Sequence, residues 1–140
     1  MLRKASAEWR GGLKDGRGRV STASGAVKGV RYSFSTRFES EPGTNPEELV
    51  AAAHAACFSM ALSSELGKAG YQPVDIDTTA TLDFDKTEVG WTAKSIHLDV
   101  KAKVPGADPA KFLAAAEAAK KTCPISRLLN TNITMTAKLV

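Results

Sequence analysis

Two cysteines, Cys57 and Cys123, are the residues best suited to redox chemistry in this 140-residue chain. They stand 66 positions apart, and neither belongs to a CxxC motif or to a run with the spacing of zinc ligands. In a cytosolic protein, reducing systems keep such thiols free, which disfavours a permanent structural disulfide. We therefore expect a reactive dithiol pair, with no metal ion and no cofactor.

Cys123 directly precedes Pro124, a residue typical of the first position of a helix. Cys123 is then the N-cap, beside unpaired backbone N–H groups and the positive end of the helix dipole, and both favour a thiolate. The plainer alternative is a capping position that happens to hold cysteine.

Cys57 lies in an apolar stretch, residues 49–62, that only His54 and Ser59 interrupt. A helix that is apolar on every side must be surrounded, so we place it at the centre of the fold or of an oligomer. Such a buried cysteine can be a plain core residue. His54, one helical turn earlier, could act as its base, or it is a packed histidine that donates to a backbone carbonyl. His97 alternates with charged residues on a polar strand face, where we expect no specific role.

A reactive Cys57 needs a cation nearby. Burial raises the pKa of a thiol, whereas nucleophilic attack requires the thiolate. The planar guanidinium of an arginine suits this role, because it can hold the thiolate and also donate to peroxide oxygens. The candidates are Arg17, Arg19, Arg31, Arg37 and Arg127.

The start of the apolar helix is marked by three residues. Asn45 is the expected N-cap, Pro46 the first helical residue and Glu48 the partner in a capping box. Glu47 has no such local role and is free to point elsewhere. On one straight helix Glu47 and Cys57 are about 15 Å apart. If both serve one site, a bend or a partner subunit must bring Glu47 close.

The remaining elements follow from the spacing of apolar residues. Alternation predicts strands near residues 4–10, 19–24, 30–37, 76–85, 96–104 and 131–140, with 76–85 and 96–104 joined as a hairpin. Asp108 and Pro109 open an amphipathic helix, and a short helix begins at Pro124. The order βββ-α-ββ-αα-β defines an α+β fold, and we expect residues 1–140 to form a single domain.

Composition and charge disfavour several classes of function. The chain has 19 basic and 15 acidic residues, a net charge of +4, and its densest basic stretch, residues 17–19, is short. Nucleic-acid binding needs a continuous basic footprint, so we expect none. The N-terminus has charges where a signal peptide needs an apolar stretch, and the longest apolar run is too short to span a bilayer. We expect a cytoplasmic protein that does not bind membranes.

Several segments resemble the osmotically inducible protein C (OsmC) family. The main one runs from Gly-Thr-Asn-Pro-Glu-Glu-Leu at residues 43–49 through Ala-His-Ala-Ala-Cys-Phe-Ser-Met-Ala-Leu at 53–62. Cys-Pro-Ile-Ser at 123–126, Thr-Arg-Phe-Glu at 36–39 and Ala-Glu-Trp at 7–9 fit the same family. The family is related to the organic hydroperoxide resistance proteins, which are cysteine peroxidases that prefer organic hydroperoxides to hydrogen peroxide.

The resemblance implies a role for each candidate residue. Cys57 corresponds to the cysteine that attacks the hydroperoxide, and Cys123 to the resolving cysteine that forms a disulfide with it. Arg37 corresponds to the arginine that activates the thiolate, and Glu47 to the carboxylate that holds it. The organic hydroperoxide branch has its arginine earlier in the chain, so Arg17 or Arg19 is the competing assignment.

The resemblance also implies the fold and the partners. The family fold is an intertwined homodimer, with antiparallel sheets wrapped around central helices and active sites at the subunit interface. Related members are reduced by dihydrolipoyl groups on lipoylated proteins, so a dithiol reductant is expected. Two alternatives remain: a non-catalytic redox sensor or stress-binding protein that uses the same disulfide as a switch, and a structural dimer whose cysteines only fill the core.

Overall fold

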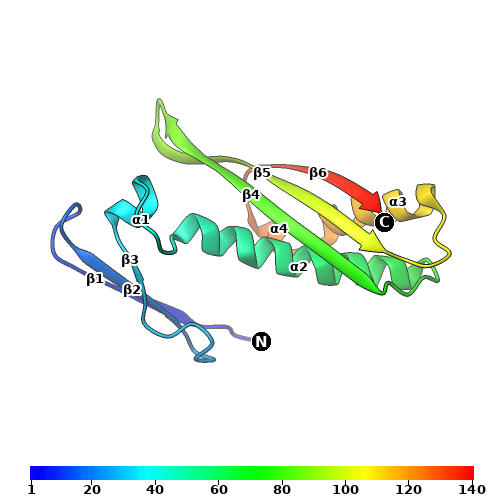
Figure 1. Ribbon diagram of the computed structural model, residues 1–140, viewed down its shortest axis with the longest axis horizontal. Coiled ribbons are helices and arrows are strands. Elements are labelled where there is room, and N and C mark those ends of the chain that lie inside the picture. The colour runs from blue at the N-terminus through cyan, green and yellow to red at the C-terminus, as the bar shows by residue number, and fades with distance from the viewer. The chain divides into compact units, whose positions relative to one another are not determined.

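The computed structural model describes all 140 residues, which form two compact units, Met1–Leu49 and Val50–Val140 (Figure 1). In Figure 1 the first unit is coloured from blue to cyan and the second from green to red. That residues 1–140 act as a single domain stays a prediction.

The first unit is built on a three-stranded antiparallel sheet. Its strands β1 (Ala5–Arg10), β2 (Arg17–Thr22) and β3 (Val30–Tyr32) lie in the order β1-β2-β3. Gly18 pairs with Trp9 on one side and with Tyr32 on the other. The ring centroids of Trp9 and Tyr32 lie 5.6 Å apart, and a Cβ on Gly18 would lie 2.4 Å from the Tyr32 ring. Glycine is therefore required between these two aromatic residues.

A short helix, α1 (Phe34–Phe38), replaces most of the strand expected over residues 30–37. Ser33 is its N-cap in a capping box: the Thr36 N–H donates to Ser33 Oγ at 3.2 Å, and the Ser33 N–H donates to Thr36 Oγ1 at 2.9 Å. These local hydrogen bonds compete with strand pairing and turn the chain. The strand prediction was wrong beyond Tyr32, and Arg37 lies on a helix.

Helix α2 (Pro46–Lys68) begins where the sequence predicts. The backbone N–H of Glu48 donates to Asn45 Oδ1 at 2.8 Å, which confirms Asn45 as the N-cap. The Glu48 carboxylate accepts from Thr44 Oγ1 at 3.1 Å, so the expected capping box is only half formed. The buried residues of α2 recur every four positions and define one inward face, namely His54, Phe58, Leu62 and Leu66.

The opposite side of α2 is not covered by the rest of the second unit. Ala52, Ala53 and Ala56 are exposed, and Met60 retains 77% of its accessible surface. The second unit by itself therefore does not surround this helix, and its place at the centre of the fold or of an oligomer stays a prediction.

By length and composition, α2 is also apolar enough to cross a membrane. An 18-residue stretch of this helix has a mean hydropathy of 1.4, and 22% of that stretch is buried. This corrects the expectation that no run is long enough to span a bilayer. The core helix of a soluble protein meets the same criterion, so this property alone is weak evidence for a membrane span.

The second unit contains a mixed three-stranded sheet. Strands β4 (Asp75–Thr87) and β5 (Gly90–Lys103) form the predicted antiparallel hairpin, and β6 (Asn132–Leu139) pairs with β5 in parallel. The expectation of antiparallel sheets was wrong for this pair of strands. The chain crosses over between β5 and β6 through helices α3 (Pro109–Thr122) and α4 (Pro124–Leu128), and such a crossover makes the two strands parallel. Two small sheets with four helices confirm the α+β class.

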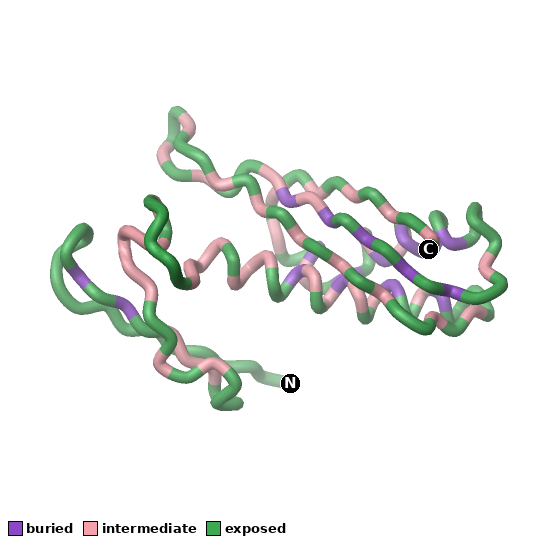
Figure 2. The backbone as a smooth tube through the Cα atoms, in the orientation of Figure 1, coloured by how far each residue is buried: buried purple, intermediate pink, exposed green.

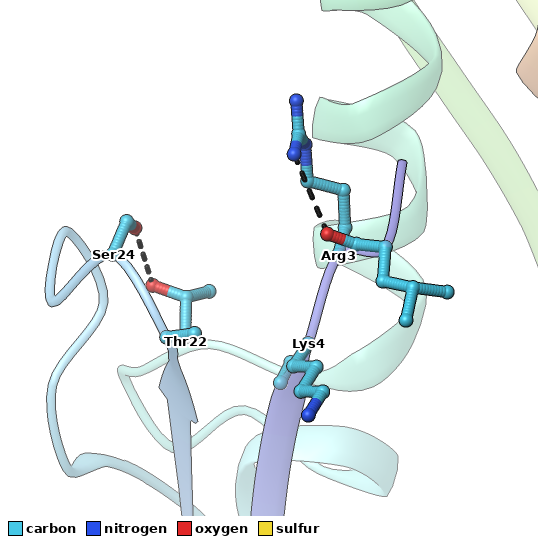
Figure 3. Close-up of a pocket in the computed structure, with 7 residues that line it drawn as sticks. Arg3, Lys4, Thr22 and Ser24 are labelled. Carbon is cyan, nitrogen blue, oxygen red and sulfur yellow. Dashed lines mark hydrogen bonds between the residues drawn. The ribbon is translucent and has the colours of Figure 1, made fainter.

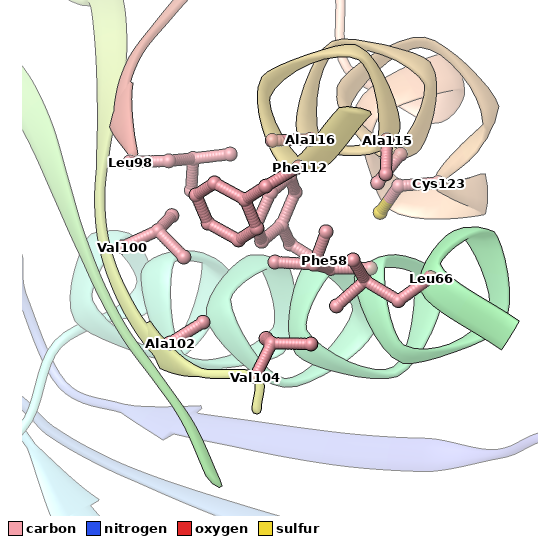
Figure 4. Packing of buried hydrophobic residues seen from close by; sticks show 12 residues of the cluster. Phe58, Leu66, Leu98, Val100, Ala102, Val104, Phe112, Ala115, Ala116 and Cys123 are labelled. Carbon is pink, nitrogen blue, oxygen red and sulfur yellow. The ribbon is translucent and has the colours of Figure 1, made fainter. Parts of the chain in front are cut away.

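The core of the second unit lies between β5 and the helices α2 and α3. Figure 2 shows buried residues in purple on β5, and from Ile96 to Ala102 they stand at every second position, the period expected of a strand with one covered face. In Figure 4, Phe58 of α2, Val100 of β5 and Phe112 of α3 converge, and Cys123 joins the same cluster. This packing holds α2 and the end of α3 together, and so determines where Cys57 and Cys123 lie.

Candidate active site

The two cysteines meet in the second unit. Cys57 Sγ of α2 and Cys123 Sγ lie 3.0 Å apart, and the Cys123 thiol donates to the Cys57 sulfur. Both cysteines are free. Cys123 ends α3, where its N–H donates to Ala119 O at 2.9 Å, and it is also the N-cap of α4, as predicted. Its side chain makes no capping hydrogen bond, so the thiol is available to Cys57.

The degree of burial differs from expectation. The sequence predicts the more deeply buried site for Cys57, but Cys123 is fully buried and Cys57 only half-buried. Cys123 lies where α3 ends against the core, whereas the side of α2 next to Cys57 is only partly covered. Cys57 is therefore the thiol that a molecule from solvent reaches first.

Several neighbours affect the ionisation of Cys57. Burial of its sulfur raises the pKa of the Cys57 thiol, and the hydrogen bond and charge interaction with Cys123 raise it further. A backbone hydrogen bond from Ile125 lowers it. Ile125 is the second residue of α4, so its N–H is one of the groups that a helix start leaves unpaired. From sequence, these groups were expected to act on Cys123 alone; the fold directs one of them to Cys57.

His54 contacts Ser126 rather than a backbone carbonyl. His54 Nε2 lies 2.7 Å from Ser126 Oγ, His54 is fully buried, and His54 Nδ1 has no hydrogen-bond partner. Burial lowers the pKa of His54, so the neutral imidazole is favoured. Sequence reasoning gave Ser126 no role, although its spacing from Cys123 equals that of His54 from Cys57.

Arg37 and Glu47 meet in the first unit. Arg37 Nε donates to both carboxylate oxygens of Glu47, at 2.9 and 3.2 Å, and Arg37 Nη2 donates to Glu47 Oε1 at 2.6 Å. The Glu47 side chain is 15% exposed and that of Arg37 37%, and the Arg37 guanidinium also lies 5.0 Å from the centre of the Phe38 ring. Such a two-pronged ion pair fixes the orientation of the guanidinium plane.

The competing arginines have different surroundings. Arg17 donates to the carbonyl oxygens of Asp15 and Gly16, at 3.1 and 2.9 Å, and Arg19 donates to that of Gly29 at 3.3 Å. Both side chains are exposed, and neither pairs with a carboxylate. Of these three arginines, only Arg37 is held by an acidic side chain.

An aromatic pocket of about 270 Å³ adjoins Arg37 in the first unit. Its apolar walls are the side chains of Trp9, Leu13, Tyr32, Phe34 and Phe38. The pocket therefore combines an apolar surface with one oriented guanidinium.

A cavity of about 740 Å³ lies at the start of β1, beside Arg3, Lys4, Thr22 and Ser24 (Figure 3). Arg3 donates only to Leu2 O and the Met1 sulfur, at 3.4 Å each, and Thr22 Oγ1 lies 3.1 Å from Ser24 Oγ. The lining is almost entirely exposed, so this is a shallow depression without a buried polar group.

The candidate residues thus form two clusters in separate units, Arg37 with Glu47 and Cys57 with Cys123. No group of three or more His, Cys, Asp or Glu side chains is arranged to hold a metal ion. His97 belongs to neither cluster: its Nδ1 lies 2.7 Å from Thr134 Oγ1, and its Nε2 lies 3.3 Å from Thr136 Oγ1.

Comparison with known proteins bears on both clusters. Residues 38–138 match the family described as OsmC-like protein. Over 137 residues the chain is 49% identical to Peroxiredoxin OsmC of Escherichia coli (strain K12), covering 98% of this chain and 96% of that protein. It is 30% identical over 98 residues to the Organic hydroperoxide resistance protein of Xanthomonas axonopodis pv. citri (strain 306), covering 69% of this chain and 67% of that protein.

The fold has solved counterparts. The Organic Hydroperoxide Resistance Protein OhrB of Bacillus subtilis superimposes with a TM-score of 0.68 at 24% identity, covering 98% of both chains. Glu47, Cys57 and Cys123 lie inside the family match, and Arg37 directly precedes it.

Proposed function

This chain belongs to the OsmC-like protein family and is a thiol-dependent peroxidase, and we propose that it reduces organic hydroperoxides through Cys57 and Cys123. The observation that carries this proposal is the 3.0 Å contact between the two free sulfur atoms. Their unequal burial supports an order of events in which the accessible thiol reacts first and the buried thiol second.

In the first step the Cys57 thiolate attacks the terminal oxygen of ROOH. The O–O bond breaks and the terminal OH passes to the sulfur, so that Cys57 becomes a sulfenic acid, while RO⁻ takes up the proton that the thiol lost on ionisation and leaves as the alcohol ROH. In the second step the Cys123 thiol attacks this sulfur, water leaves, and the Cys57–Cys123 disulfide forms. The short distance between the sulfurs favours this closure over release of the sulfenic acid to other thiols.

We assign Arg37 to activation of Cys57 and Glu47 to orientation of Arg37. Burial raises the pKa of the Cys57 thiol, so the thiolate needs a cation that is already oriented. The hydrogen bonds from Arg37 to both oxygens of Glu47 supply such an orientation. Glu47 and Cys57 are ten positions apart on α2, or about 15 Å along a straight helix. We therefore propose that Arg37 acts on Cys57 of the partner subunit.

The preference for organic hydroperoxides is supported by the aromatic pocket next to Arg37. An alkyl group buried against Trp9, Tyr32 and Phe34 gains about 25 cal/mol for each Å² removed from water. Hydrogen peroxide has no alkyl group and gains nothing from such walls. The name of the Xanthomonas relative points to the same substrate class.

We propose that the 140 residues act as one domain in a homodimer. The side of α2 that carries Met60 is uncovered, and every residue of β1 is exposed, including Trp9. An apolar helix side such as the one that carries Met60 is normally covered by a partner. Sedimentation analysis should give a dimer for the wild type and a monomer for Met60→Lys; a monomeric wild type would contradict the proposal.

The cycle closes when a dithiol, in our proposal one carried by a lipoylated protein, reduces the disulfide. Exchange begins at the accessible sulfur, that of Cys57, and releases the buried Cys123 thiol. A reducing compartment such as the cytoplasm suits this cycle, because the disulfide must be reopened in every turnover.

Steady-state turnover with cumene hydroperoxide and dihydrolipoamide tests the function. The wild type should consume many equivalents of hydroperoxide, and Cys57→Ser should consume none above the uncatalysed rate. Ser59→Ala, on the same helix and outside the proposed chemistry, should retain wild-type turnover. Consumption of a single equivalent by the wild type would instead indicate a redox sensor, and full turnover by Cys57→Ser would rule out the mechanism.

A further inference from the structure

We propose that His54 and Ser126 form a positioning pair that holds α4 against α2, so that Cys123 reaches the Cys57 sulfenic acid before a second hydroperoxide does. This inference rests on the proposed function and assigns a task to two residues outside the reacting atoms. Neither residue touches substrate in this mechanism; both act through Cys123.

The geometry of the two helices carries the argument. Cys57 follows His54 by three positions on α2, and Ser126 follows Cys123 by three positions at the start of α4. Cys57 contacts Cys123 at 3.0 Å, and His54 contacts Ser126 at 2.7 Å. Residues three positions apart lie on one helix face. The two contacts are therefore neighbours, and both join the same face of α2 to the same face of α4.

Helix α4 has little stability of its own. It is five residues long, shorter than a helix needs to persist in water, and its N-cap side chain makes no capping hydrogen bond. The thiol of that N-cap residue, Cys123, is directed to Cys57 instead. The position of α4 must therefore come from tertiary contacts, among which the buried contact between His54 and Ser126 is polar and directional.

The two contacts between α2 and α4 behave differently during the reaction. Cys57 gains an oxygen when it becomes a sulfenic acid, so its contact with Cys123 must change at the moment when Cys123 has to attack. The bond between His54 Nε2 and Ser126 Oγ involves no reacting atom and persists through this step. The contact between His54 and Ser126 therefore keeps Cys123 aligned while the contact between Cys57 and Cys123 changes.

The state of His54 suits a permanent hydrogen bond. Its imidazole is fully buried and Nδ1 has no partner, so a protonated ring would leave a buried N–H without an acceptor. With the neutral ring, Nε2 holds Ser126 in either tautomer, because a hydroxyl both donates and accepts. Removing the Ser126 hydroxyl leaves both ring nitrogens of His54 without partners.

The balanced step under test is Cys57–SOH plus Cys123–SH giving the disulfide and water. Rapid-quench mass spectrometry with one equivalent of cumene hydroperoxide follows sulfenic acid formation and disulfide formation separately. In Ser126→Ala and His54→Leu we expect the first rate to fall by about threefold at most, because a displaced α4 weakens the effect of Ile125 on Cys57, and the second to fall about tenfold, the value of one oriented hydrogen bond. The hydroperoxide concentration that converts half of Cys57 to sulfinic acid should fall by the same factor.

Two further variants separate positioning from stability. Ser126→Thr keeps the hydroxyl and should keep the wild-type rate of disulfide formation. The double variant His54→Leu with Ser126→Ala leaves no unpaired polar group, so it should recover part of the stability lost in Ser126→Ala while disulfide formation stays slow. This double variant also serves if Ser126→Ala alone does not fold.

Ser59→Ala is the matched control. Ser59 lies on α2 near Cys57 and bonds Thr78 Oγ1 of β4 at 2.8 Å, so it joins the same helix to the sheet rather than to α4. Both rates should stay at wild-type values. Normal disulfide formation in the folded His54 and Ser126 variants, or an equal fall in both rates, would overturn the positioning role alone. A wild type that forms no disulfide would overturn the proposed function, and this inference with it.

Discussion

The sulfur atoms of Cys57 and Cys123 lie 3.0 Å apart, although one belongs to a long helix and the other to a junction between two shorter ones. The backbone N–H of Ile125, in the first turn of α4, also lowers the pKa of the accessible thiol. One short segment therefore brings both the partner thiol and a stabilising N–H to Cys57. This arrangement makes the two thiols chemically unequal.

Loss of the buried thiol should separate the two halves of the cycle. Cys123→Ser should still react with one equivalent of hydroperoxide, because Cys57 remains accessible, and then stop at the sulfenic acid. Turnover with dihydrolipoamide should fall by roughly two orders of magnitude, and excess hydroperoxide should give sulfinic acid at Cys57. Mass spectrometry of the intact protein checks this outcome. Normal cycling by Cys123→Ser would show that Cys123 is not the resolving thiol.

The ion pair of Arg37 with Glu47 predicts a graded loss of activity. Arg37→Ala removes the donor that we propose for the peroxide oxygens and should lower kcat/KM about 10²- to 10³-fold. Glu47→Gln keeps a neutral acceptor for the guanidinium and should cost only about tenfold. Arg19→Ala, which removes an arginine bound only to a backbone carbonyl, is the control and should be near wild type. A large loss in Arg19→Ala with none in Arg37→Ala would transfer the role to the earlier arginine.

The ionisation of Cys57 predicts how its reactivity depends on pH. Burial raises the pKa of this thiol, so less thiolate is present at neutral pH and the rate of alkylation rises with pH. In Arg37→Ala the midpoint of this rise should lie above that of an ordinary, solvent-exposed cysteine, because burial still raises the pKa of the Cys57 thiol. If Arg37 acts on Cys57, the wild-type midpoint lies lower. Alkylation by iodoacetamide at a series of pH values measures both, and identical midpoints would refute the assignment.

The burial of His54 predicts a loss of stability in acid. The pKa of His54 is lowered by burial from its ordinary value of 6.5, so between the folded-state pKa and 6.5 the unfolded chain binds a proton that the folded chain does not. The free energy of unfolding therefore falls as the pH decreases through this window, by up to about 1.4 kcal/mol per pH unit. His54→Gln lacks this contribution. Urea unfolding at a series of pH values between about 5 and 7 gives the free energy of unfolding at each pH. This free energy should change less with pH in the variant than in the wild type, and an equal pH dependence would contradict the prediction.

The elements that depend on local signals were predicted well. The start of α2 at Asn45, the hairpin of β4 and β5, and the N-cap position of Cys123 each depend on residues a few positions apart. The helix α1 was missed because the capping box of Ser33 and Thr36 overrides an alternating pattern that is equally compatible with a strand. Where two local signals compete, the hydrogen bonds actually formed decide.

By itself the sequence determined which residues are candidates: two thiols, a set of arginines, and a helix too apolar to stand alone. Tertiary structure alone decided that Cys123 is the buried thiol, that an N–H of α4 reaches Cys57, and that Ser126 faces His54. The reason is physical. Residue type and spacing define local hydrogen bonds and helix faces, whereas burial and contacts between distant residues arise only when α2, α3 and β5 pack into one core.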